Sequence, residues 1–202
     1  MSDERFEAFV GLCFEQEFAG SAHLADALEK WGASTEPNET GWNIANGFMS
    51  SSSLCRLRGA GDAFSWSSMG DALVIDAGGS QGRTSITLAN QFPKLNFIVQ
   101  GSAQVCVQGG LLALDPELRD RIRFQAHDIF RPRESIPGKT VIYFLCAVLH
   151  NWNDKYACRI LQAIVPAMKH GDRIVLCELI IPEPGTDSIF LERFARASDF
   201  QM

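Results

Sequence analysis

Between Trp66 and Glu183 the chain alternates short apolar runs with segments of helical period, and this alternation constrains the fold more than any other feature. A short apolar run is typical of a buried strand, and a 3.6-residue apolar period is typical of an amphipathic helix. The expected strands are Ala72–Ala77, Phe97–Val99, Ile122–Ala126, Val141–Leu145 and Arg173–Ile181. The expected helices are Thr84–Gln91, Val105–Leu114 and Lys155–Lys169, with Gly171 ending the last one. Strands that alternate with helices predict an α/β fold with a doubly wound, mostly parallel sheet and right-handed crossovers.

The first 65 residues lack this alternation. The segment Glu4–Trp31 has an apolar helical face that includes Phe6 and Phe9, and Ser21 is placed to cap a second helix within it. From Ser50 to Gly61 the chain is rich in serine and glycine and poorly periodic. We therefore expect a small helical N-terminal segment, residues 1–65, followed by an α/β domain, residues 66–202.

Composition and charge exclude several classes of function. The chain of 202 residues has a formal net charge of -6, whereas a general nucleic-acid binder shows a basic face. No uninterrupted apolar run approaches the roughly 20 residues needed to span a bilayer, and the charged first residues lack the apolar stretch of a signal peptide. We therefore expect a cytoplasmic protein that binds neither nucleic acid nor membranes. The six cysteines include no Cys-x-x-Cys pair, so we expect reduced thiols and no metal site.

A glycine-rich turn follows the first expected strand, where the sequence from Asp76 to Gly82 reads D-A-G-G-S-Q-G. Glycine allows a tight turn and a close approach of the backbone to a ligand, and the next helix offers free N–H groups. A plain strand-to-helix turn is the alternative, but a position after the first strand of an alternating series favours ligand binding at Gly78, Gly79 and Gly82. The spacing differs from the G-x-G-x-x-G fingerprint, because Asp76 stands in the place of the first glycine. This difference disfavours a nicotinamide cofactor.

The D-x-G-G-x-x-G run is similar to motif I of class I S-adenosylmethionine-dependent methyltransferases. Five further segments, in the same order, resemble plant caffeic-acid-type and fungal secondary-metabolite O-methyltransferases: Asn96–Gln100, Ala126–Phe130, Leu149–Asp154, Val165–Gly171 and Ile181–Gly185. For example, L-H-N-W-N-D resembles the family segment "LHNWSD". The resemblance implies a Rossmann-like methyltransferase fold and S-adenosylmethionine as cofactor. It also implies methyl transfer to a hydroxyl of a small phenolic or enolic metabolite.

The resemblance implies roles for individual residues at the carboxyl ends of the strands. The cofactor contacts that it implies are Gly78, Gly79, Gly82, Gly101, Ser102, Asp128, Ile129, Cys146 and Trp152. Asp128 is expected close to the adenine amino group, and Trp152 close to the adenine ring. An isolated tryptophan is also common in a protein core, so core packing is the alternative for Trp152.

The catalytic residues that the resemblance implies are His150 and Glu178. An imidazole titrates near neutral pH, which suits a general base that takes a proton from the acceptor hydroxyl. Glu178 matches a family position where a carboxylate orients this histidine and stabilises its charged form. A structural imidazole is the alternative for His150, and a solvated charge is the alternative for Glu178. The place of His150, after a strand of a parallel sheet, favours catalysis.

Two positions depart from the family pattern within the expected cofactor site. Gly101 replaces an acid that normally holds both ribose hydroxyls of the cofactor, and the loss of such hydrogen bonds costs on the order of 2–5 kcal/mol of binding. Gln100 or Ser102 is expected to compensate only in part. Cys146 stands where fungal relatives often carry arginine, so a cationic contact is missing.

The two ends of the chain also depart from the family pattern. Relatives continue beyond the position of Met202, so we expect the sheet to be incomplete at its C-terminal edge, with Arg173–Ile181 exposed as an apolar edge strand. The helical segment 1–65 resembles a remnant of the family's dimerisation domain, which leaves a homodimer possible.

These observations leave three functions open. The first is methyl transfer from S-adenosylmethionine to a small-molecule acceptor. The second is a degenerate methyltransferase-like protein without methyl transfer, acting as a cyclase, an isomerase or a binding partner, and Gly101 is the feature that favours it. The third is a nicotinamide oxidoreductase, which the glycine spacing and the lack of a Tyr-x-x-x-Lys pair disfavour.

Overall fold

The computed structural model of the chain describes residues 22–32, 34, 36, 39, 44, 60–61, 64–110, 116–178 and 183–186. By its internal contacts the chain divides into two compact units. The unit that holds the sheet comprises Cys55–Leu149 and Asp154–Glu178. The other comprises Met1–Leu54, His150–Asn153 and Leu179–Met202. Much of the N-terminal segment lies outside the described residues, so the domain boundary between residues 65 and 66 stays a prediction.

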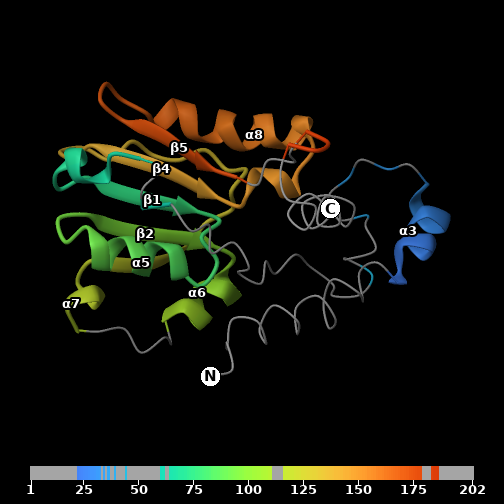
Figure 1. Ribbon diagram of the computed structural model, residues 1–202, viewed down its shortest axis with the longest axis horizontal. Helices are drawn as coiled ribbons and strands as arrows, with labels where there is room; N and C mark the ends of the chain where they lie inside the picture. The colour runs from blue at the N-terminus through green and yellow to red at the C-terminus, as the bar shows by residue number, and fades with distance from the viewer. Residues whose placement is uncertain are drawn as a thin grey trace. The chain divides into compact units, whose positions relative to one another are not determined.

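The sheet unit contains five parallel strands, which confirms the α/β, doubly wound fold expected from the alternation (Figure 1). The strands are β1 (Leu73–Ala77), β2 (Asn96–Gly101), β3 (Ile122–Ala126), β4 (Val141–Cys146) and β5 (Arg173–Cys177). Their order in the sheet is β3-β2-β1-β4-β5. The chain therefore moves outward from β1 to β3, returns to the other side of β1 with β4, and moves outward again. Ligands of such sheets bind beside the carboxyl ends of the strands where the direction reverses, which here is the end of β1.

The connections contain the helices α5 (Arg83–Gln91), α6 (Ala103–Gly110), α7 (Pro116–Arg119) and α8 (Asp154–Ile164). Short 3-10 turns are η2 (Trp66–Met69), η3 (Leu149–Asn151) and η4 (Val165–Ala167). In Figure 1, α5, α6 and α7 lie on the β2 side of the sheet, and α8 lies on the β5 side. Residues 111–114 of the expected helix Val105–Leu114 lie outside the described residues.

Both faces of the sheet are buried at its central strands β1 and β4, where consecutive residues, whose side chains point to opposite faces, are buried. One face carries Val74, Phe97 and Phe144, which pack with Leu88 of α5 and with Trp66 in a single apolar cluster. The Trp66 ring is 1% exposed, and its Nε1 donates a hydrogen bond of 2.6 Å to the carbonyl oxygen of Ala60. Alternate residues on the strands, such as Ile75 and Tyr143, are also buried, as are Ile160 and Ile164 of α8. Burial on both faces explains why these strands read as continuous apolar runs.

The last helix of the sheet unit is shorter than expected. The α-helix ends at Ile164 and not at Lys169, and a 3-10 turn follows. Pro166 has no backbone N–H to continue the helix, and its ring disfavours helical geometry at the preceding residue. Val165, expected on the inner face of this helix, is therefore 57% exposed. Gly171 does not cap the helix but lies with φ +96° in the turn before β5.

β5 pairs only with β4 in the described sheet and forms its edge, with Leu176 half exposed. Residues 179–181 of the expected strand lie outside the described residues. In the other unit, the structure describes helix α3 (Leu24–Trp31) within the expected helical region, and residues 4–21 are not described. Among the described residues, no helix combines the length and the apolarity that crossing a bilayer requires.

The packing of α6 on β3 generates a testable prediction. A methyl group on Gly109 would lie 2.2 Å from the Phe124 ring, and that ring is already 3.0 Å from the position of a Cβ on Gly82. The ring is thus confined on two sides, so Gly109→Ala should lower the free energy of unfolding by about 1–3 kcal/mol, measured by urea denaturation.

Gly110→Ala is the matched control, because a Cβ on Gly110 would meet no atom within 4 Å. Alanine favours a helix over glycine, so this variant should be neutral or more stable by up to about 1 kcal/mol. Equal destabilisation by both substitutions would contradict the packing argument.

Candidate functional site

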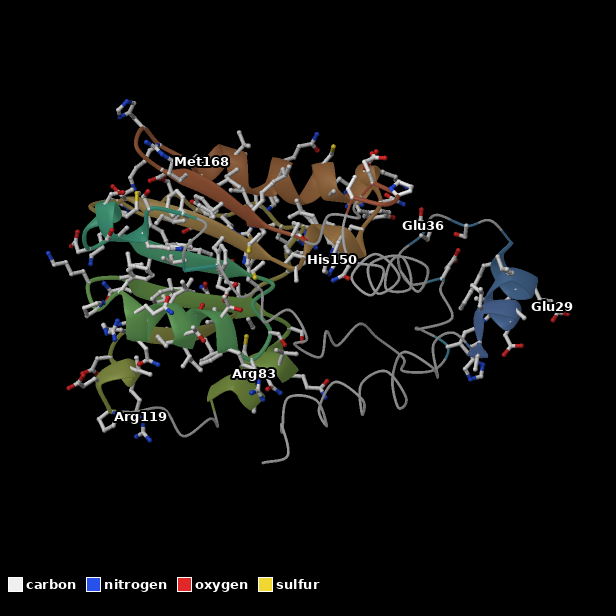
Figure 2. The ribbon with its side chains drawn as sticks, viewed as in Figure 1. Glu29, Glu36, Arg83, Arg119, His150 and Met168 are labelled. Atoms are coloured by element: carbon white, nitrogen blue, oxygen red, sulfur yellow. The ribbon has the colours of Figure 1, made fainter. Side chains whose placement is uncertain are left out.

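The glycine turn lies at the carboxyl end of β1 and is fixed to the neighbouring strand β2. Gly78 and Gly82 adopt φ of +81° and +75°, a region that L side chains rarely occupy, and Gly82 forms the N-cap of α5. The N–H groups of Gly78 and Gly79 both donate to the carbonyl oxygen of Gln100, at 2.9 and 3.1 Å. Figure 2 labels Arg83, the first residue of α5, on the side of the domain where β1 and β2 end.

Close contacts exclude any side chain from the middle of this turn. A Cβ on Gly79 would lie 2.3 Å from Cγ of Asp76. A Cβ on Gly78 would lie 3.1 Å from Cγ2 of Val148 and 3.6 Å from Cδ1 of Ile129. The structure therefore brings three predicted cofactor contacts, Gly78, Gly79 and Ile129, together at the carboxyl edge of the sheet. Val148, which the sequence analysis did not single out, joins them from the end of β4.

Asp76 is a buried acid directly beneath the turn. Its side chain is 1% exposed, Ser85 Oγ donates to its Oδ2 at 2.6 Å, and its Oδ1 has no hydrogen-bond partner among the described residues. Burial raises its pKa from 3.8 to about 6, against the opposing effect of the Ser85 hydrogen bond. From the sequence, Asp76 was expected only to distinguish the glycine spacing from a dinucleotide fingerprint. The sequence did contain a signal that Asp76 is a buried acid at the site, because it is the only charged residue within the apolar run Ala72–Ala77.

The side chains on either side of Gly101, at the end of β2, form hydrogen bonds within the protein. The Gln100 side chain is buried, donates to Oε1 of Gln125 at 2.9 Å and accepts from Nε of Arg133 at 3.1 Å. Ser102 is exposed, and its Oγ accepts a long hydrogen bond of 3.4 Å from the N–H of Val105 at the start of α6. The two side chains expected to replace the missing acid therefore both have bonds of their own.

Asp128 follows β3 by two residues and is more than half exposed. Its Oδ1 accepts from the N–H of Phe130 at 3.0 Å, and its Oδ2 lies 3.7 Å from Nε of Arg131. These local contacts hold the turn after β3 and leave Asp128 accessible from solvent. Its contact with an adenine stays a prediction.

Cys146 ends β4 in register with Cys177 of β5, and both side chains pack against the core cluster. Burial raises the pKa of the Cys146 thiol far above its ordinary value, and the nearby Cys177 adds to this effect. Burial also raises the pKa of Cys177. The thiols are therefore protonated near neutral pH and behave as small apolar groups. The cofactor contact of Cys146 stays a prediction.

The segment before His150 is held by Glu178. Ala147 turns the chain out of β4 with φ +55°, and its N–H donates to the carbonyl oxygen of Cys177 at 2.8 Å. Oε1 of Glu178 then accepts from the N–H groups of Val148 and Leu149, at 3.0 and 2.8 Å. Glu178 thus acts on the backbone next to the histidine, a role that the sequence analysis did not foresee. His150 and Trp152 follow in the other compact unit, and their predicted roles stay predictions.

The raised pKa of Asp76 predicts a pH dependence of stability. Its pKa is about 6 in the folded chain and near 3.8 when unfolded, so the folded state binds the extra proton between these values. The contribution of Asp76 to stability is complete below pH 3.8 and is lost as the pH rises through 6, which amounts to about 3 kcal/mol. Urea denaturation at several pH values should show this loss in the native chain relative to Asp76→Asn, which has no proton to lose. Parallel stability profiles of the two proteins would contradict the raised pKa.

The two hydrogen bonds of Glu178 give a second prediction. Glu178→Ala leaves two partly buried N–H groups without their acceptor and should lower the free energy of unfolding by about 1–3 kcal/mol. Glu178→Gln keeps an oxygen that accepts both bonds, so it should recover most of this loss. If the glutamine variant is as unstable as the alanine variant, the negative charge matters and the backbone bonds do not.

Comparison with known proteins identifies the family. The family model of the O-methyltransferase domain matches residues 18–195. O-methyltransferase aoiF of Aspergillus oryzae is 32% identical over 231 residues, which cover 100% of this chain and 54% of that protein. The grayanic acid biosynthesis cluster O-methyltransferase of Cladonia grayi is 41% identical over 157 residues, which cover 75% of this chain and 34% of that protein. The chain thus spans about half the length of the curated relatives that match all of it.

The fold agrees with this match. The structure of human N-acetylserotonin methyltransferase in complex with S-adenosylmethionine aligns with a TM-score of 0.70 at 22% identity, covering 96% of this chain and 59% of that chain. This similarity confirms the Rossmann-like methyltransferase fold that the resemblance implied. Because the family model matches residues 18–195, most of the chain, the chain belongs to the O-methyltransferase domain family.

Proposed function

We propose that this chain binds S-adenosylmethionine at the glycine turn and transfers its methyl group to a hydroxyl of a small phenolic or enolic metabolite. The observation that carries the proposal is the turn itself. Gly78 and Gly79 form a cradle at the carboxyl edge of the sheet that a Cβ would fill, and Asp76 lies directly beneath it. This place in a doubly wound sheet is where nucleoside ligands bind.

The residues present fit this cofactor. Asp76 is a buried acid beneath the turn whose Oδ1 has no hydrogen-bond partner among the described residues, so its charge would attract a cationic ligand beside the turn. The start of α5 adds the positive end of a helix dipole for a carboxylate. Ile129 and Val148 give apolar contacts at Gly78. When bound, S-adenosylmethionine supplies an electrophilic methyl group on a sulfonium sulfur.

His150 is the proposed general base. In this proposal the imidazole takes the proton of the acceptor hydroxyl, and the oxygen becomes nucleophilic enough to accept a methyl group. Glu178 is a positioning residue, since it fixes the N–H groups of Val148 and Leu149 immediately before His150. Its carboxylate therefore fixes the backbone that leads into the proposed base, and the effect on the charge of the imidazole that the sequence suggested stays a prediction.

The names of the relatives support a small-molecule acceptor, because one of them is the grayanic acid biosynthesis cluster O-methyltransferase of Cladonia grayi. The solved structure of a neocarzinostatin-pathway O-methyltransferase contains S-adenosylmethionine and a hydroxy-naphthoic acid. These names support an aromatic hydroxyl as the methyl acceptor here. A cytoplasmic location and a homodimer stay predictions from the sequence.

The test is a methyl-transfer assay with labelled S-adenosylmethionine and a panel of phenols, followed by mass spectrometry. His150→Ala should lower turnover by about 100-fold or more, the usual contribution of a general base, and should change the cofactor Kd less than about threefold. His170→Ala is the matched control, because His170 is an exposed imidazole outside the proposed site. Equal loss of turnover and of cofactor binding would make His150 structural. Cofactor binding without any transfer would favour the degenerate methyltransferase-like protein.

A further inference from the structure

Gly101 occupies the position at which a side chain of a doubly wound sheet contacts the ribose of a nucleoside. In such sheets an acid about 20 residues after the glycine loop, at the end of the second strand, hydrogen-bonds a ribose hydroxyl. Here β2 ends at Gly101, and the carbonyl oxygen of the preceding Gln100 accepts from both Gly78 and Gly79. Gly101 therefore lies immediately beside the glycine turn.

The backbone does not require glycine at this position. Gly101 is not among the residues with positive φ, and a Cβ built on it would meet only Val105, at 3.8 and 4.0 Å. These distances are ordinary van der Waals contacts. Gly79, in contrast, would collide with Asp76 if it carried a Cβ. The glycine at 101 thus leaves open space, and the glycine at 79 avoids a collision.

The residues that flank Gly101 in the sequence do not supply a replacement carboxylate. The sequence from Gln100 to Cys106 contains no acid. The buried amide of Gln100 already bonds to Gln125 and Arg133, and the Ser102 hydroxyl bonds to the start of α6. The Gln100 amide is therefore engaged within the protein, and Ser102 offers a hydroxyl but no carboxylate.

Because Gly101 lies beside the glycine turn without a carboxylate, we infer that the nucleoside site of this chain does not distinguish ligands by their ribose hydroxyls. It takes S-adenosyl ligands whose ribose lacks a hydroxyl or bears a small substituent at the 2′ or 3′ position. The inference rests on the proposed function and deepens it, because it specifies which part of the cofactor the site reads. Recognition then comes from the amino-acid portion at the glycine turn and from the adenine.

Calorimetric titration of the native chain tests this directly, with S-adenosylhomocysteine and its 2′-deoxy, 3′-deoxy and 2′-O-methyl analogues as probes. The four ligands should bind with Kd values within about threefold of one another. A Kd for S-adenosylhomocysteine at least tenfold lower than that of the deoxy analogues would overturn the inference and leave the proposed function standing. Failure of all four ligands to bind would overturn both.

Gly101→Asp supplies the missing acid at a position where a Cβ makes only ordinary contacts. This variant should bind S-adenosylhomocysteine at least tenfold more tightly than the native chain, and it should lose that gain with the deoxy analogues. Gly110→Asp is the matched control, since it adds the same charge at an unobstructed position at the other end of α6. Equal gains from both variants would show a general charge effect and would overturn the assignment to Gly101.

Discussion

The candidate site depends on the contact between the carboxylate of Asp76 and the backbone at Gly79. Only a hydrogen atom fits between them, because a Cβ on Gly79 would lie 2.3 Å from Cγ of Asp76. The carboxylate is held from the other side by Ser85 in the first turn of α5, so strand, turn and helix are fixed by one buried group. Burial of an acid is unfavourable, and the raised pKa of Asp76 reflects this cost. In the proposed function, a cationic ligand at the turn would offset part of that cost.

The other half of the carboxyl edge is built by β4 and β5. Their parallel register places Cys146, the last residue of β4, beside Cys177, the last residue of β5. Glu178 directly follows β5 and therefore lies next to the end of β4. From there its carboxylate reaches the N–H groups of Val148 and Leu149. Val148 in turn contacts the position of Gly78, which connects the segment before His150 to the glycine turn. Asp76 and Glu178 thus fix the backbone on the two sides of the proposed cofactor site.

Local patterns in the sequence predicted the strands, their parallel arrangement and the glycine turn, because apolar runs and glycine spacing are properties of neighbouring residues. The end of α8 was placed too late, although Pro166 gave a local signal against a longer helix. The bonds of Glu178, and the Phe124 ring between Gly82 and Gly109, join residues far apart in the chain. Such contacts follow from strand order and register, which the alternation of elements alone does not specify. The same reason explains why Gln100 was expected to assist a ribose, although it bonds to Gln125 and Arg133.

The most direct test of the cofactor site is a titration of the ¹⁵N-labelled chain with S-adenosylmethionine, followed by two-dimensional NMR of its amides. We expect the largest chemical-shift changes at the amides of Gly78, Gly79 and Gly82, with smaller changes at the end of β2 around Gly101. The edge strand Arg173–Leu176, whose amides lie away from the turn, should change little. Saturable binding without chemical-shift changes at the three glycine amides would contradict cofactor binding at the glycine turn.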